Sequence, residues 1–159
     1  MPDERVIAEG QRGERPVAPS GQVRLRVLLV EDDPRVRALY GALLDLEGYW
    51  SEIVATAPEG IASIERNAPD IALVDLDLSG VDGCELARKV RTSSAGRGVF
   101  LAALTGFDDP EDRRRAREAG FDAYLVKSVN FKELLALLAE QDRQVRQPRV
   151  SAPTRRLPR

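Results

Sequence analysis

The chain has 159 residues, about the length of one domain, with 43% hydrophobic and 31% charged residues. No apolar run approaches the roughly 18 residues needed to cross a bilayer, and the amino terminus has no hydrophobic segment of the kind a signal peptide requires. A single cysteine, Cys84, excludes an intrachain disulfide and a multi-cysteine zinc cluster. We therefore expect a cytoplasmic protein with no membrane partner.

The chain contains no histidine. This excludes Ser–His and Cys–His catalytic pairs, histidine metal ligands and a phosphohistidine. If phosphate moves along a histidine-to-aspartate relay, this chain is the aspartate end, and the phosphate donor is another molecule.

Charge is distributed unevenly along the chain. Residues 25–140 carry 21 acids and 14 bases, whereas residues 141–159 carry one acid and six arginines. Residues 1–22 and 143–159 lack hydrophobic periodicity, which is typical of poorly ordered tails. We expect the folded domain to span residues 23–142.

Five short apolar runs alternate with helical patterns in this central part. Several are apolar at consecutive positions, as expected of parallel strands covered on both faces. The predicted strands are Leu25–Val30, Ile53–Ala55, Ile71–Leu76, Val99–Leu104 and Ala123–Val126.

The helical patterns carry start signals and buried stripes. Asp33-Pro34 predicts the first helix start, Gly48 its end, and Thr56 to Glu59 forms a capping box for the second. The fourth helix, Asp109–Ala119, has only two alanines in its stripe, so it is the weakest packed and a candidate for movement. The expected buried stripes of the other helices are Val36, Leu39, Tyr40 and Leu43; Gly83, Leu86, Ala87 and Val90; and Phe131, Leu134, Leu135 and Leu138, the last in a helix opening at Asn130 to Glu133.

Five right-handed β–α units predict an α/β fold with an open, doubly wound parallel sheet and helices on both faces. Such sheets place their sites at the carboxyl ends of the strands. The polar residues there are Glu31, Asp32 and Asp33 after the first strand, Asp75 and Asp77 after the third, Thr105 after the fourth and Lys127 after the fifth.

Each of these residues alone has a simpler explanation. The acidic triplet is typical of a helix cap, Asp75 of a turn, Thr105 of a loop hydroxyl and Lys127 of a solvent-facing side chain. Cys84 is typical of core packing. Together, however, converging carboxylates repel one another unless a cation joins them. Oxygen ligands without histidine or thiolate suit magnesium, and a nearby lysine and hydroxyl suit phosphate. These are the parts needed to form an aspartyl phosphate.

Four motifs in this order resemble the receiver domain of two-component response regulators: Val27–Asp33 with Pro34, Asp70–Gly83, Leu104–Gly106 and Ala123–Lys127. The resemblance covers about residues 25–140. It implies a flavodoxin-like strand order of 2-1-3-4-5. It also implies a phosphoprotein that catalyses only its own phosphorylation and dephosphorylation, with Mg2+ as cofactor.

The resemblance also assigns roles to the residues. Asp75 is the implied phosphoacceptor, Glu31 and Asp32 the acidic pair at the metal, and Asp77 a metal ligand through its backbone carbonyl. Lys127 would pair with the phosphoryl group. Thr105 would turn toward it, and Tyr124 would rotate inward. The altered face would comprise the fourth helix, fifth strand and fifth helix, and would bind a downstream protein.

Two residues depart from the family pattern. Ser79 stands where receivers usually have proline after the phosphoacceptor strand, and Ser128 follows Lys127 where proline, often in cis, is usual. A cis bond before serine would cost about 2.5–4 kcal/mol. The reach of Lys127 therefore depends on how this loop is held.

Other functions remain open at this point. Asp75-Leu-Asp77 also resembles the nucleophile motif of haloacid dehalogenase-type phosphatases, although no paired acid follows Lys127. A nucleotide-binding oxidoreductase is discounted because no Gly-x-Gly-x-x-Gly follows the first strand.

The basic tail is too short for a helix-turn-helix and lacks aromatic residues, so nucleic acid is not an expected partner. The arginines of the fourth helix, at positions 113–115 and 117, are expected to form a solvated face, with docking of a partner as the alternative. We expect a stand-alone receiver, phosphorylated by a sensor histidine kinase or a histidine phosphotransfer protein. The alternative is a receiver cut from a larger kinase or regulator.

Overall fold

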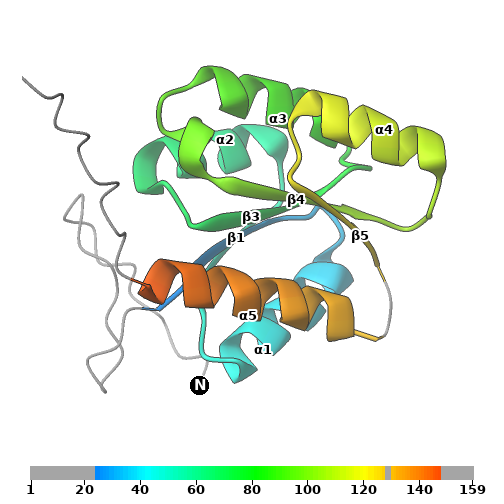
Figure 1. Ribbon diagram of the computed structural model, residues 1–159. Helices are drawn as coiled ribbons and strands as arrows, with labels where there is room; N and C mark the ends of the chain where they lie inside the picture. Colours follow the sequence, from blue (N-terminus) through cyan, green and yellow to red (C-terminus); the bar gives the residue numbers. More distant parts are fainter. Residues whose placement is uncertain (1–23, 128–129, 148–159) are drawn as a thin grey trace, which may run out of the picture.

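The computed structural model describes residues 24–127 and 130–147, and these form one parallel sheet with helices on both faces (Figure 1). The strand order is β2-β1-β3-β4-β5, which confirms the fold expected from the sequence. The strands are β1 (Arg26–Val30), β2 (Trp50–Val54), β3 (Ile71–Asp75), β4 (Phe100–Thr105) and β5 (Ala123–Val126).

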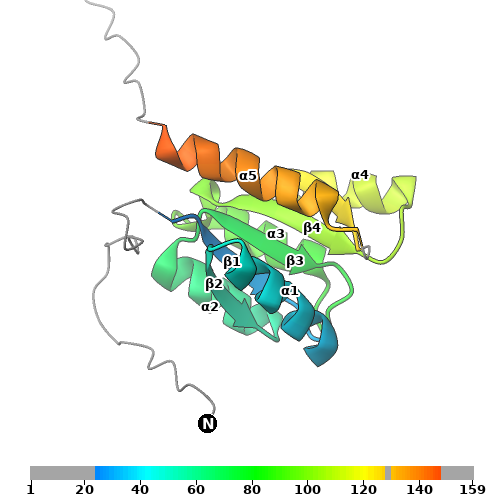
Figure 2. The same ribbon diagram turned by 90° about the horizontal axis from the view of Figure 1, so that it is seen from below.

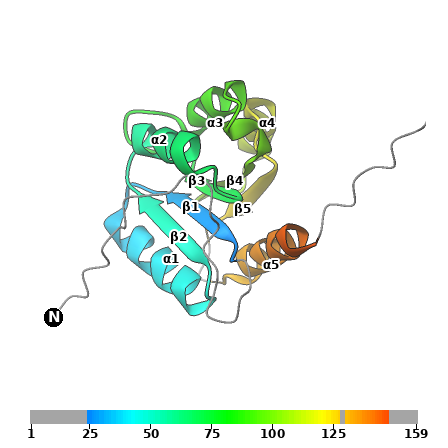
Figure 3. The same cartoon turned by 90° about the vertical axis from the view of Figure 1, so that its left-hand side faces the viewer.

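Helices α1 and α5 cover one face of the sheet, and α2, α3 and α4 cover the other (Figures 1 and 3). Seen from below, α1 and α5 lie in front of the sheet (Figure 2). The helices are α1 (Pro34–Leu46), α2 (Ala57–Asn67), α3 (Gly83–Thr92), α4 (Pro110–Ala119) and α5 (Lys132–Arg146), with a short 3-10 turn at Gly96–Gly98.

Alternate residues of the central strands feed two separate cores. Leu28 and Val30 of β1 pack with the α2–α4 helices, whereas Val27 and Leu29 pack with α1 and α5. This alternation follows from the pleat, which sends successive side chains to opposite faces. It explains why β1 and β3 are apolar at almost every position.

The helix starts follow the predicted capping chemistry. The Asp33 side chain accepts a hydrogen bond from Arg35 N, and Thr56 Oγ1 accepts one from Glu59 N. The Glu59 carboxylate reaches back to Ala55 N at 3.1 Å, one residue earlier than in a regular capping box. These bonds satisfy backbone donors that the first helical turn leaves free.

The structure corrects some predicted boundaries and stripes. Leu39 was predicted to be buried but is 51% exposed, because α1 turns Tyr40, Gly41 and Leu44 toward the sheet instead. Leu135 is only half-buried. Strand β2 starts at Trp50, three residues before the predicted Ile53.

Helix α5 runs to Arg146, beyond the predicted domain boundary at residue 142, because Val145 packs against the core and Arg146 pairs with Asp142 at 3.0 Å. The rest of the predicted tails, residues 1–22 and 148–159, lies outside the described residues.

Helix α4 buries only Ala116 and Ala119, as its sequence predicted. Its arginines 113, 114, 115 and 117 are all exposed, as expected. Cys84 is 2% exposed within the core on the α3 side, and burial raises the pKa of its thiol. Within the described residues, no helix is both long and apolar enough to span a membrane.

Candidate functional site

Three carboxylates meet where the central strands end. Val30 of β1 pairs with Val74 of β3, so the next residues, Glu31 and Asp75, lie side by side. One oxygen from each of Glu31, Asp32 and Asp75 lies within 4.8 Å of the others. The structure therefore brings together the three acids predicted from the sequence.

Lys127, directly after β5, adds a positive charge to these acids. Its Nζ lies 2.8 Å from Glu31 Oε2 and 3.1 Å from Asp75 Oδ1. Lys127 N donates to Thr105 O at 2.6 Å, which ties the lysine's backbone to the end of β4. Ser128, which replaces the usual proline after Lys127, lies outside the described residues.

The electrostatics of the site reflect burial and crowding. The Glu31 side chain is 1% exposed, and burial is the main reason that its pKa is raised, with repulsion from Asp75 adding to it. Burial opposes the charge of Lys127. However, its hydrogen bond to Glu31 and the charges of both acids outweigh burial and raise the pKa of the ammonium.

The donor set fits a hard divalent cation. Three carboxylates face one ammonium, which leaves an excess of negative charge in a mostly buried cluster. Oxygen ligands without histidine or thiolate are those that magnesium prefers. Glu31, Asp32 and Asp75 are the residues that would hold such an ion.

Asp75 is the last residue of β3 and is 2% exposed. Its Oδ1 accepts a hydrogen bond from Asp77 N at 3.0 Å, and the Asp77 side chain is exposed. Gly83 packs closely behind it, because a Cβ there would lie 2.5 Å from Asp75 O. The first turn of α3 therefore needs glycine to approach the acidic cluster.

Thr105 and Tyr124 both bond to the backbone of Phe107, in the loop after β4. Thr105 Oγ1 accepts from Phe107 N at 3.3 Å, and Tyr124 OH donates to Phe107 O at 2.9 Å. The Arg113 guanidinium lies 4.6 Å from the centroid of the Tyr124 ring and bonds to Asp108. The two predicted switch residues, Thr105 of β4 and Tyr124 of β5, therefore both contact the loop that connects β4 to α4.

Two contacts at the site were not predicted from the sequence. Ser79, noted there only as a departure from proline, donates both its N and its Oγ to Asp32 Oδ2. Arg37 of α1 donates to the backbone oxygens of Glu31 and Asp32, at 3.0 and 2.7 Å. The hydrogen bonds from Ser79 lower the pKa of Asp32. The contact from Ser79 joins residues 47 positions apart and so has no local signal, whereas Arg37 lies only five and six positions from its two partners.

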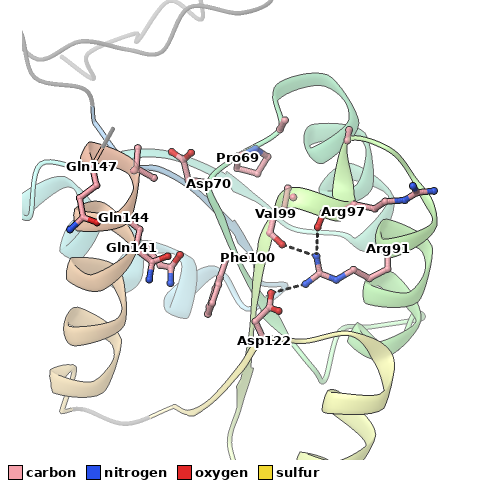
Figure 4. Close-up of a pocket in the computed structure, with 14 residues that line it drawn as sticks. Pro69, Asp70, Arg91, Arg97, Val99, Phe100, Asp122, Gln141, Gln144 and Gln147 are labelled. Carbon is pink, nitrogen blue, oxygen red and sulfur yellow. Dashed lines mark hydrogen bonds and ion pairs between the residues drawn. The ribbon is translucent and has the colours of Figure 1, made fainter. Parts of the chain in front are cut away.

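A further cavity lies away from these acids. It has a volume of about 690 Å3 near the amino ends of β3 and β4 (Figure 4). Gln141 and Gln144 of α5 line one side, together with Gln147 directly after this helix. On the other side, the Arg91 guanidinium binds Gly120 O, Gly96 O and Val99 O and pairs with Asp122 at 2.7 Å. These bonds give Arg91 a structural role, because they join α3 to the segments before β4 and after α4.

The lone tryptophan, Trp50, is predicted to be insensitive to events at the acidic cluster. It was expected just before β2 and is instead its first residue, paired with Arg26 at the opposite end of β1 from Glu31. Five residue steps of about 3.3 Å separate the two ends by roughly 16 Å.

Titration with magnesium should therefore leave tryptophan emission nearly unchanged while calorimetry detects saturable binding. Quenching with the same midpoint as binding would contradict this placement of the cation site.

Comparison with known proteins identifies relatives of this chain. A family model for the response regulator receiver domain matches residues 27–139. The gliding motility regulatory protein of Myxococcus xanthus is 39% identical over 138 residues, which are 86% of this chain. The match spans 17% of that protein's length, and this chain spans about half the length of several transcriptional regulators that it matches.

Solved structures agree with the fold. A CheY-like receiver domain protein from Methanospirillum hungatei JF-1 has a TM-score of 0.67 and 35% identity, over 76% of this chain and 98% of that one. The receiver domain of the Pseudomonas aeruginosa PAO1 sensor histidine kinase PA1611 has a TM-score of 0.70 and 32% identity, with the same coverage. That structure holds a magnesium ion in its active site cleft.

Proposed function

The chain belongs to the response regulator receiver domain family, and on this premise we propose that it accepts a phosphoryl group on Asp75 from a phosphohistidine of another protein. The donor would be a sensor histidine kinase or a histidine phosphotransfer protein. The phosphorylated form would then bind a downstream protein through α4, β5 and α5. Family membership favours this function over the phosphatase alternative that Asp75-Leu-Asp77 raised.

One observation carries the proposal: a buried aspartate shares its site with two more carboxylates and a lysine. Glu31, Asp32 and Asp75 each offer an oxygen within 4.8 Å, and Lys127 Nζ lies 3.1 Å from Asp75 Oδ1. A bound magnesium ion would supply positive charge that screens the incoming phosphoryl group from these acids. Glu31, Asp32 and Asp75 are the residues proposed to hold it, with the Asp77 carbonyl as a further ligand.

The transfer itself is a displacement at phosphorus. Asp75 Oδ1 already accepts a hydrogen bond from Asp77 N and faces Lys127, so we assign the attack to the other oxygen, Oδ2. As the bond from Oδ2 to phosphorus forms, the phosphorus–nitrogen bond of the donor breaks. The imidazole keeps the electron pair. The Lys127 ammonium is placed to stabilise the charge that arrives.

The conformational change that carries the effect of phosphorylation from Asp75 to α4 would begin at Thr105. The Thr105 hydroxyl accepts a hydrogen bond from Phe107 N. The carbonyl oxygen of Phe107 accepts another from the Tyr124 hydroxyl. If Thr105 turns to donate to a phosphoryl oxygen, it loses the bond to Phe107, and the loop that holds Tyr124 is loosened. The weakly packed α4 follows this loop. The charge of the phosphoryl group on Asp75 would therefore shift the position of α4.

The Arg113→Ala variant is expected to accept phosphate from acetyl phosphate about two- to fivefold faster than the wild type. The guanidinium over the Tyr124 ring holds the tyrosine against the loop, and an exposed cation–π contact is weak, so its loss is worth only about two- to fivefold. Removing it shifts the equilibrium toward the released tyrosine by the corresponding factor.

Arg114→Ala is the matched control for this variant, because Arg114 pairs only with Glu111 and Glu118 of its own helix among the contacts described. Initial rates of phosphorylation measure the effect. Equal phosphorylation rates in the wild type and Arg113→Ala would show that Arg113 has no part in the conformational change.

The experiment that tests the proposed function is phosphorylation by acetyl phosphate, followed by intact mass. We expect one added phosphoryl group, dependent on magnesium, in the wild type and none in Asp75→Asn. Labelling that persists in the variant would place the phosphoacceptor elsewhere.

A further inference from the structure

Ser79 links two loops across the mouth of the acidic cluster. It lies in the loop between β3 and α3, and it donates to Asp32 of the loop after β1. The distances to Asp32 Oδ2 are 3.0 Å from Ser79 N and 2.6 Å from Ser79 Oγ. Hydrogen bonds to an ionised acceptor are shorter and stronger than neutral ones.

Asp32 is the acid that most needs such an anchor. Glu31 and Asp75 are almost completely buried and are held by Lys127, whereas Asp32 is only half-buried. Arg37 donates to the backbone oxygen of Asp32, and this bond does not orient the carboxylate. Two hydrogen bonds from Ser79 hold this carboxylate in its orientation.

Both donors use the same carboxylate oxygen. Oδ1 of Asp32 takes no part in either bond and is left for a cation. Fixing the side chain before binding removes part of the entropy cost of ordering a ligand. Partners that orient a metal ligand in this way typically contribute about 10- to 100-fold to metal affinity.

We propose that Ser79 is a positioning residue for the cation site, which holds Asp32 ready to bind magnesium. The inference rests on the proposed function, since it takes Asp32 as a metal ligand. Because Ser79 is exposed and its donors are neutral, the effect belongs at the low end of that range, about tenfold.

Three substitutions separate the two bonds. Ser79→Ala removes the hydroxyl and keeps the N–H, Ser79→Pro removes both donors, and Ser79→Thr keeps both. Ser94→Ala is the control, because Ser94 is exposed and lies in the loop after α3, far along the chain from the acids. Magnesium affinity is measured by calorimetry without any phosphodonor, and thermal unfolding is measured on the metal-free proteins.

We expect affinity to fall about threefold in Ser79→Ala and about tenfold in Ser79→Pro, and to stay within about twofold of wild type in Ser79→Thr and Ser94→Ala. Loss of the hydrogen bond should lower the unfolding temperature of metal-free Ser79→Ala slightly. The recovery of magnesium affinity in Ser79→Thr separates positioning of Asp32 from a merely structural role. If Ser79→Pro does not fold, the alanine and threonine variants still decide the question.

Equal magnesium affinity in the wild type and Ser79→Ala would overturn the inference and leave the proposed function standing. Tighter binding in Ser79→Ala would also overturn it, because Ser79 would then compete with the cation. A wild type that binds no magnesium would overturn both this inference and the proposed metal site.

Discussion

Replacing Lys127 with alanine is expected to lower the free energy of unfolding of the metal-free protein by about 3 kcal/mol at pH 7. Lys127 Nζ is shared by Glu31 and Asp75, whose side chains are 1% and 3% exposed. Removing one partner of a buried ion pair leaves uncompensated charge, which typically costs 3–5 kcal/mol. The estimate is at the low end because Lys127 is itself 23% exposed.

The loss should depend on pH with a definite sign. Burial already raises the pKa of Glu31 in the folded protein, and the loss of the lysine raises it further. A carboxyl whose pKa is higher in the folded state destabilises the fold as pH rises and the group ionises. The difference between Lys127→Ala and wild type should therefore shrink between pH 7 and pH 5.

Lys89→Ala is the matched control, because Lys89 and its partner Glu85 are 61% and 52% exposed. Such surface pairs are worth at most about 1 kcal/mol. Urea unfolding at both pH values checks the prediction. A loss in Lys127→Ala no larger than in Lys89→Ala would contradict the proposed burial of charge.

Lys127→Ala should also separate phosphorylation from switching. Transfer to Asp75 is expected to persist in part, while phosphorylation-dependent amide shifts in α4 become smaller than in the wild type. Shifts of wild-type size would mean that the lysine does not couple the phosphate to the loop after β4.

Arg91→Ala is the second substitution with a large expected effect, a loss of about 2–4 kcal/mol in the free energy of unfolding. One guanidinium binds the carbonyls of Gly96, Val99 and Gly120 and the carboxylate of Asp122. It thereby ties the end of α3, the start of β4 and the end of α4 together. Each buried acceptor left unsatisfied costs about 1–3 kcal/mol, and water entering the cavity offsets part of the sum.

Arg97→Ala provides the control on the rim of the same cavity, since the Arg97 side chain is exposed (Figure 4). Chemical denaturation of both variants decides the matter. Small and similar losses in the free energy of unfolding of the two variants would show that Arg91 contributes no more than a surface arginine. The phosphorylation rate should be unchanged in both variants.

Much of the fold could be predicted because the signals are local. Apolar runs marked the parallel strands, and Asp33, Thr56 and Asp109 accept the hydrogen bonds expected of helix caps. The position of the site followed from topology, since parallel strands end at one edge. Asp75 ends β3, Thr105 ends β4 and Lys127 follows β5.

Other features depend on contacts between distant parts of the chain. The exposure of Leu39 depends on how α1 is rotated against the sheet, and several registers fit its apolar pattern. The bond from Ser79 to Asp32 joins residues 47 positions apart, and the bond from Arg91 to Gly120 joins residues 29 apart. Neither hydroxyl nor guanidinium carries a periodic signal, so sequence patterns could not reveal these partners.

The most direct test of the central claim is to locate the phosphoryl group chemically. Borohydride reduces an acyl phosphate to an alcohol, which converts the modified aspartate to homoserine. Trypsin should release residues 67–88 as one peptide that holds Asp70, Asp75, Asp77 and Asp82. Fragmentation of this peptide after acetyl phosphate treatment should place homoserine at position 75. Homoserine at another aspartate, or phosphate on Ser79, would contradict the account.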